Sequence, residues 1–108
     1  MVYNSYMSKC YSLTAVIEDK RGRVLSIGQN SYVKTHPLQA HHAAKVGEPY
    51  RQVLHAEVAA IIKCRDLSKA HRIKIFRFGR DGRPRLAAPC KVCQSAIKAA
   101  GIKIIEHT

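Results

Sequence analysis

Two short motifs about thirty residues apart constrain this chain more than any other feature of its sequence. The first is His55-Ala56-Glu57 and the second is Pro89-Cys90-Lys91-Val92-Cys93. Two thiols three residues apart at a helix start face the same way, because such residues are neighbours on a helical surface. One imidazole and two thiolates suit zinc, and three protein ligands leave a fourth position for water. The fold must therefore bring the starts of two helices together around one metal ion.

Glu57 has a different place in this pattern from the three residues that could bind zinc. It lies only two residues after His55, so it is not needed as a ligand, yet it can take a proton from a water at the open position. Cys64 lies seven residues further on, roughly 10 Å along a helix axis, so it cannot bind the same ion. Cys10 and Cys64 are therefore expected to be free thiols.

H-x-E followed by P-C-x-x-C is the pattern of zinc-dependent nucleobase deaminases. The sequence resembles the cytidine and deoxycytidylate deaminase superfamily, in particular its short, often phage-encoded members. The resemblance covers most of the chain, from about residue 13 to residue 105. It implies Zn²⁺ as cofactor, with His55, Cys90 and Cys93 as ligands and Glu57 as the catalytic acid and base.

The resemblance also implies a mechanism and a set of substrate contacts. Water activated by zinc attacks C4 of cytosine or C6 of adenine, while Glu57 carries protons to the ring nitrogen and to the departing ammonia. Asn30, in a G-x-N motif, would lie beside the sugar, and the backbone amide of Ala56 would donate to the base carbonyl. Asn30 is equally typical of a turn residue in the left-handed conformation. Ala88 replaces the acidic or polar residue that the family often has before P-C.

Three functions compete at this stage. The first is deamination of a cytosine-bearing nucleotide, either free or within single-stranded nucleic acid. The second is deamination of adenosine in RNA, which uses the same core. The third is a non-catalytic, zinc-stabilised module that binds nucleic acid. Glu57 disfavours the third, since a structural site has no use for a carboxylate there, and the run His55-Ala56-Glu57-Val58 leans toward cytidine.

The charge of the chain points toward phosphate-bearing partners. Nineteen Lys and Arg residues oppose seven Asp and Glu, which gives a formal net charge of +12. Ten basic residues lie between Lys63 and Lys91, opposed only by Asp66 and Asp81. Such an excess favours polyanions such as nucleic acid, although a basic surface can also serve solubility alone. We expect Arg80, Arg83 and Arg85 to contribute to nucleic-acid binding.

Length and composition predict a single cytosolic domain over residues 1–108. A chain of 108 residues can bury a core but is too short for two domains. No apolar run reaches the length of a membrane span, and the first residues lack the pattern of a signal peptide. Two thiols in a metal pattern fit a reducing compartment, so we expect a cytoplasmic protein with no membrane partner.

Hydrophobic periodicity predicts alternating strands and helices. A hairpin is predicted over 13–27, turning at Lys20-Arg21-Gly22. A helix over 54–67 has an apolar stripe of Leu54, Val58, Ile61 and Ile62. Further elements are a strand over 72–78, a helix over 90–100 opened by Pro89 and a strand over 102–105. Residues 5–11 have room for only a short helix.

These elements predict an α/β fold, a three-layer or reduced sandwich around a mixed sheet of about four strands, and the resemblance implies that it is of the cytidine-deaminase-like type. The resemblance implies strand order 2-1-3-4. The two β-helix-β connections predict parallel neighbours. The fifth strand of larger relatives is missing, which leaves an uncovered edge and predicts a homo-oligomer, a dimer or larger.

The segment 31–52 is a long connection that contains three histidines, His36, His41 and His42. Residues 38–45 have room for one or two helical turns. The histidines could hold a second metal, or form a lip with His36 or His41 near the substrate, but solvent-facing side chains are the simplest expectation. Loops of this length are often functional.

Overall fold

Strands and helices alternate along the described part of the chain, residues 12–108 of a computed structural model. The predicted helix at 5–11 and the thiol of Cys10 lie outside the described residues. Within residues 12–108, no helix is both long and apolar enough to span a bilayer. The elements are β1 (Ser12–Glu18), β2 (Val24–Gln29), α2 (Pro37–Lys45), α3 (Ala56–Lys63), the 3₁₀ turn η1 (Leu67–Lys69), β3 (Arg72–Phe78), α4 (Lys91–Ala99) and β4 (Ile104–His107).

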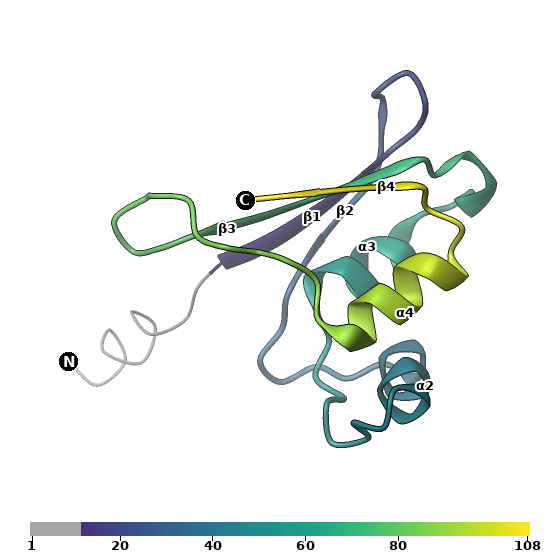
Figure 1. The fold of residues 1–108 in the computed structure, drawn as a ribbon, viewed down its shortest axis with the longest axis vertical. Coiled ribbons are helices and arrows are strands. Elements are labelled where there is room, and N and C mark those ends of the chain that lie inside the picture. The colour runs from purple at the N-terminus through teal and green to yellow at the C-terminus, as the bar shows by residue number, and fades with distance from the viewer. Residues whose placement is uncertain (1–11) are drawn as a thin grey trace.

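The four strands form one mixed sheet in the order β2-β1-β3-β4, which confirms the predicted order. Strand β1 is antiparallel to both β2 and β3, whereas β3 and β4 are parallel. The expectation of parallel neighbours is therefore right for β3 and β4 only. The connection through α3 joins β2 to β3, but β1 lies between these two strands in the sheet (Figure 1).

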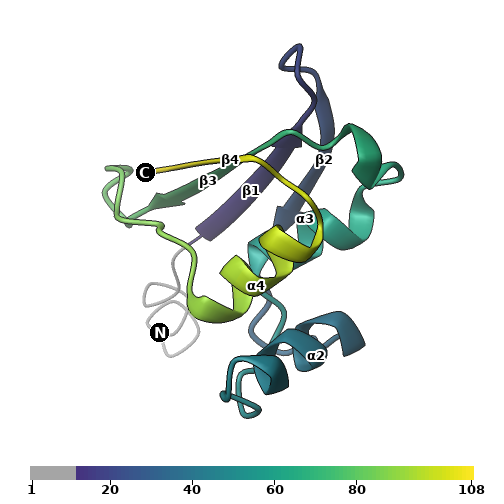
Figure 2. The ribbon, with the colours of Figure 1, turned by 45° about the vertical axis from the view of Figure 1, so that its right-hand side comes forward.

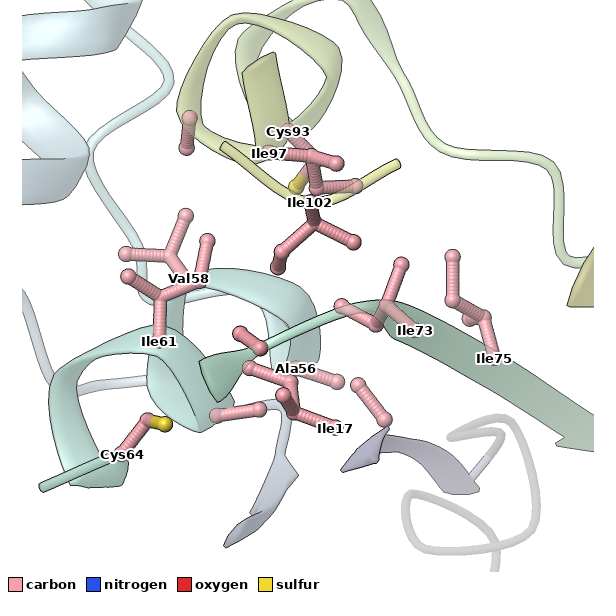
Figure 3. Packing of buried hydrophobic residues seen from close by; sticks show 14 of the residues in the cluster. Ile17, Ala56, Val58, Ile61, Cys64, Ile73, Ile75, Cys93, Ile97 and Ile102 are labelled. Atoms are coloured by element: carbon pink, nitrogen blue, oxygen red, sulfur yellow. The ribbon is translucent and has the colours of Figure 1, made fainter. Parts of the chain in front are cut away.

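Helices α3 and α4 lie on the same side of the sheet, and α2 packs beyond them against α4 (Figure 2). Side chains that alternate along β1 and β3 face these helices, as expected for strands with one covered face. These side chains and the apolar side chains of α3 and α4 form one cluster of buried apolar residues (Figure 3). Its fully buried large members are Ile17, Val58, Ile73, Ile75 and Ile97.

The contact between β2 and α3 is unusually close because it is made at a glycine. A Cβ atom built on Gly28 would lie 2.2 Å from the backbone nitrogen of Ala60 and 2.5 Å from the carbonyl oxygen of Ala56. Beside it, the Ser26 hydroxyl donates a hydrogen bond to the Ala60 carbonyl oxygen at 2.7 Å. The backbone of β2 thus rests directly on α3 and fixes the position of the helix start.

Helix α3 is shorter than the predicted helix over 54–67. It ends at Lys63, because Cys64 adopts an extended conformation and Asp66 opens the separate 3₁₀ turn by accepting from the backbone N–H of Ser68. Val58 and Ile61 are buried as the apolar stripe requires, but Ile62 is 38% exposed. The stripe is therefore narrower than the sequence pattern suggested.

The last strand begins two residues later than predicted because the end of α4 uses those residues. Gly101 has φ of 78°, and its backbone N–H donates to the carbonyl oxygen of Lys98. The N–H of Ile102 donates to the carbonyl oxygen of Ile97 at 3.3 Å. This pair of bonds is a Schellman motif, which satisfies the last carbonyls of a helix. Ile102 thus completes the helix cap before β4 starts at Ile104.

Candidate metal centre

The starts of α3 and α4 bring His55, Cys90 and Cys93 together. His55 is the N-cap of α3, Cys90 is the N-cap of α4, and Cys93 lies in the first turn of α4. Nδ1 of His55 lies 3.2 Å from Sγ of Cys93 and 3.5 Å from Sγ of Cys90. The three donor atoms all lie within 4.8 Å of one another. Nitrogen and sulfur ligands of one tetrahedral zinc lie about 3.6 Å apart, so the group fits Zn²⁺.

The electrostatics of the group favour a thiolate at Cys90. A hydrogen bond with Cys93 is the main reason why the pKa of the Cys90 thiol falls to about 3, and His55 lowers it further. The same contact, together with burial, raises the pKa of Cys93. Hydrogen bonding to Cys90 raises the pKa of His55. The thiolate is the form that binds metal, so the lowered pKa of Cys90 is consistent with its place among the residues that fit zinc.

Glu57 lies in the same pocket but outside the group of three donor atoms. Its side chain is buried, with the residue 6% exposed, near the start of α3. Burial raises the pKa of this carboxyl, while hydrogen bonding with Cys93 and the charge of His55 oppose part of the rise. A carboxyl group with a raised pKa beside a metal site can both take and give a proton near neutral pH.

We call the hollow in front of these residues the metal pocket. Its volume is about 350 Å³, and Asn30, His55, Glu57, Arg77 and Cys90 contribute to its lining. The side-chain oxygen of Asn30 accepts a hydrogen bond from the backbone N–H of Leu13 at 3.1 Å. That bond fixes the amide group, so its NH₂ is the part able to donate to a ligand. Asn30 does not have positive φ, so the alternative interpretation as a left-handed turn residue is wrong.

Ala56 is not brought to the pocket in the same way. It is fully buried, it begins α3, and it is not among the residues that line the metal pocket. Cys64 is also buried, at the far end of α3, and stays outside the donor group, in line with the axial distance expected from the sequence. Figure 3 shows Cys64 just beyond the end of α3 and Cys93 on α4, at separate places in the core.

Helix α2 braces both metal-bearing helices, and sequence reasoning missed this role. The Gln39 side chain is fully buried, accepts a hydrogen bond from the backbone N–H of His55 at 3.2 Å and donates to the Arg51 carbonyl oxygen at 3.3 Å. Nδ1 of His42 lies 2.8 Å from the Ser95 hydroxyl of α4. The buried face of α2 consists of residues 39, 42 and 43, at helical spacing. Two of them are polar, so a hydropathy pattern does not reveal it.

The three histidines of this segment have three different environments. His36 is the N-cap of α2, and its Nδ1 accepts a hydrogen bond from the backbone N–H of Leu38 at 3.0 Å. His41 is exposed, whereas His42 is only 3% exposed, so solvent-facing side chains were the wrong expectation for His42. Neither His36 nor His41 lines the metal pocket. Among the described residues, the three form no second metal group.

Arg77 is the second site residue that sequence reasoning missed. It continues the alternation of Ile73 and Ile75 along β3, so it points to the helix-covered face and lines the metal pocket. Its guanidinium donates to the Leu86 carbonyl oxygen at 3.4 Å. Strand periodicity could have identified it, because an arginine in register with two buried isoleucines must face either the core or a pocket.

Strand β3 separates the basic residues that the sequence places between 63 and 91. Arg80, Arg83 and Arg85 lie in the loop after β3, where Asp81 pairs with Arg85 at 3.2 Å and with Arg83 at 3.8 Å. Lys69 and His71 precede β3, at the other end of the strand. The basic stretch is therefore divided between the two ends of β3 and the strand itself, which carries Arg72, Lys74 and Arg77.

The comparisons with known proteins agree with this site. The family model described as cytidine and deoxycytidylate deaminase zinc-binding region matches residues 2–106. None of the curated proteins compared with the chain matches it. The matched region contains both motifs and all three residues that fit zinc. The chain therefore belongs to the cytidine and deoxycytidylate deaminase family.

Proposed function

We propose that the protein is a zinc-dependent hydrolytic deaminase of a cytosine-bearing nucleotide, either free or within single-stranded nucleic acid. The observation that carries this proposal is the buried carboxyl of Glu57 in one pocket with His55 and Cys90. His55, Cys90 and Cys93 would hold zinc, which when bound lowers the pKa of a water in the pocket.

Glu57 moves the protons in this proposal. Its carboxylate takes a proton from the attacking water and delivers it to the ring nitrogen next to the carbon under attack. It then takes the proton of the hydroxyl formed at that carbon and delivers it to the amino group. The bond between the carbon and the amino nitrogen breaks, so that water and cytosine become uracil and ammonia. Burial, which raises the pKa of Glu57, brings the carboxyl closer to the range where it can serve in both directions.

Asn30 and Ala56 are the proposed substrate contacts. The NH₂ group of Asn30 would donate to a sugar oxygen, since its amide oxygen is already held by Leu13. The backbone N–H of Ala56 lies in the first turn of α3, where N–H groups have no intrahelical partner. Its donation to the carbonyl oxygen of the base rests on the family resemblance alone, since Ala56 is fully buried and does not line the metal pocket.

The rim of the metal pocket supports a substrate larger than one nucleotide. Tyr32 and Leu86 line the pocket and are 51% and 70% exposed. Exposed Lys34 lies close to Tyr32 in sequence. Aromatic rings interleaved with cations are the usual means of binding single strands, because bases stack on the rings while the cations meet the phosphates.

Substitution of Glu57 by Gln tests the proposal, because it keeps the size of the side chain and removes its proton transfer. We expect wild-type zinc content and melting temperature, with deamination reduced by at least about 10²–10⁴. The assay covers cytidine, deoxycytidine, dCMP, adenosine, and cytosine or adenosine in single-stranded DNA and RNA. Retained turnover in the variant contradicts the role of Glu57. If the wild type deaminates only adenosine in RNA, the proposed substrate is adenosine in RNA and no longer cytosine.

A zinc-loaded wild type that deaminates none of these substrates would favour the non-catalytic binding module. The site itself disfavours that alternative. Among the described residues the donor group has three members, and Glu57, which such a module would not need, is buried beside it.

We also propose that the protein is a homo-oligomer in the reducing cytoplasm. In the described part of the chain, β2 and β4 are the sheet edges, and Val24, Ile27 and Phe78 remain 55%, 51% and 42% exposed. Exposed apolar side chains and open edges favour association. Light scattering that shows a 12.1 kDa species at micromolar concentration would contradict this.

A further inference from the structure

A second hollow of about 550 Å³ lies at the end of the sheet away from the metal pocket. It is formed by three segments, the β1–β2 turn at 19–23, the stretch 67–71 around η1, and the α4–β4 connection at 100–103. We call it the basic pocket, because six of its lining residues are Lys20, Arg21, Arg23, Lys69, His71 and Lys103. These residues are distant in sequence, and folding brings them to one concave surface.

The basic pocket has an excess of positive charge that the described residues do not neutralise. Its five Lys and Arg residues oppose one carboxylate, that of Asp19, which leaves four charges. Asp19 is engaged in the turn, where it accepts from the backbone N–H groups of Arg21 and Arg23 and pairs with the Arg23 guanidinium at 3.2 Å. Asp66 is close to Lys69 in sequence, but its carboxylate caps η1 by accepting a hydrogen bond from the backbone N–H of Ser68.

Two cations on β3, in contrast, form ion pairs with a carboxylate. Arg72 and Lys74, on β3, each lie 3.4 Å from a carboxylate oxygen of Glu18. No described carboxylate comes within ion-pair distance of Lys20, Arg21, Lys69 or Lys103. Four cations without an ion pair among the described residues, Lys20, Arg21, Lys69 and Lys103, thus meet at one concavity. There like charges reinforce one another and raise the local concentration of anions.

The basic pocket is separate from the metal pocket. His71 lines the first and Arg77 lines the second, and six residues of β-strand span about 20 Å. Figure 1 shows the β1–β2 turn and the α4–β4 connection beyond one end of the sheet, and the loop between β3 and α4 beyond the other. An anion in the basic pocket therefore does not share atoms with a base held at Glu57.

We propose that the basic pocket binds phosphate groups, supplied either by the backbone of a nucleic-acid strand or by a free polyphosphate. The arginine guanidinium matches two phosphate oxygens at once, and lysines supply further charge on flexible arms. The wide, open hollow suits a ligand with several negative charges. This inference does not rest on the proposed deaminase activity, since the site and its chemistry are separate.

Chemical-shift mapping locates the site directly. Inorganic pyrophosphate is titrated into zinc-loaded, ¹⁵N-labelled protein, with zinc content checked afterwards. We expect the amides of 19–23, 67–71 and 100–103 to shift together and saturate, while those of 55–57 and 90–93 stay unchanged. Shifts confined to the metal pocket, or spread evenly over lysines of the whole surface, overturn the proposal.

Two double variants with equal loss of charge give the matched comparison. Lys69→Gln with Lys103→Gln removes two cations from the basic pocket, and Arg80→Gln with Arg83→Gln removes two from the opposite end. The first pair should weaken pyrophosphate binding roughly five- to tenfold, because exposed charge contacts are individually modest. The second pair should leave it unchanged. If both pairs weaken pyrophosphate binding equally, the net charge of the protein explains the binding and the proposal is overturned. Melting temperatures confirm that both variants fold.

An oligothymidylate identifies the source of the phosphate. It carries no amino group on its bases, so it cannot be deaminated. If it displaces pyrophosphate from the same amides, with affinity that falls steeply with salt, the ligand is a nucleic-acid backbone. If pyrophosphate stays bound in its presence, the ligand is a free polyphosphate. Cytidine turnover by the Lys69→Gln, Lys103→Gln variant should equal that of the wild type, which separates this test from that of the deaminase.

Discussion

The two ends of the sheet differ in how their charged side chains are arranged. At the metal end, Glu57 is buried, His55 and Cys90 are half-buried, and Nδ1 of His55 lies within hydrogen-bond distance of the two thiols. At the basic end, long exposed side chains extend from turns, and their charges outnumber the nearby carboxylates. Chemistry on a small group requires positions fixed to a fraction of an ångström. Attraction of a polyanion requires only charge in one place.

The helices explain part of this division. Both metal-bearing helices present their N-termini to the metal pocket, where the helix dipole stabilises thiolates and other anions. Their C-termini point toward the basic end, where the dipole favours cations such as Lys103 after α4. Lys20 and Arg21 lie in a hairpin turn, however, so helix ends do not account for them.

The largest difference between the two ends is expected in zinc content and melting temperature, when Cys90 at the start of α4 and Cys64 at the end of α3 are each replaced. Cys90→Ala should lose zinc and lower the melting temperature by roughly 10 °C or more, because metal binding is coupled to folding. Cys64→Ala, at the far end of α3, should keep one zinc per chain and cost about 1 kcal/mol. Metal analysis and calorimetry measure both. Full zinc in Cys90→Ala, or loss of zinc in Cys64→Ala, would contradict the assigned ligands.

A smaller effect is expected at the arginine that lines the metal pocket. Arg77→Gln should lower kcat/KM for dCMP or a single strand by about tenfold or more, as for loss of a hydrogen bond to a charged group. Cytidine, which has no phosphate, should be affected much less. Lys74→Gln, on the opposite face of the same strand, is the control. An equal loss on cytidine and dCMP would show that Arg77 shapes the pocket and does not bind phosphate.

The loop after β3 should contribute still less, because Asp81 already neutralises part of its charge. Replacing Arg80, Arg83 and Arg85 with Ala should weaken single-strand binding roughly three- to tenfold without unfolding the chain. Wild-type binding should fall by about 10³ between low and physiological salt if six phosphates are contacted. Fluorescence anisotropy measures both. Binding that is insensitive to salt would leave these arginines a role in solubility alone.

The smallest predicted effect concerns the brace between α2 and α4 at the metal end. Burial lowers the pKa of His42 below its usual value, so the folded state favours the neutral ring beside Ser95. The contribution of the neutral His42 ring to the stability of the fold is fully present above about pH 6.5. It declines as the pH falls below that value, because the unfolded chain takes up the proton more readily. The fall in melting temperature between about pH 7.5 and about pH 5.5 should be smaller in His42→Gln. An equal fall would exclude the brace as the cause.

Sequence reasoning reached the strand at 72–78 and the residues that fit zinc because each leaves a local pattern, and it reached the strand order through the resemblance to the deaminase family. It failed where tertiary contacts decide. The start of β4 depends on a helix cap that uses Ile102, and the end of α3 depends on the extended conformation of Cys64. Gln39 was missed because its role depends on hydrogen bonds to the backbone of His55 and Arg51, which lie far along the chain.

Gly28 limits how this protein can be re-engineered. The distance between β2 and α3 is set at this glycine by contact between two backbones. A single methyl group at residue 28 would collide with the helix backbone itself, which cannot rotate away as a side chain can. The helix that begins at Ala56 would have to move, and Glu57 with it. Libraries aimed at new specificity should therefore hold this one position constant.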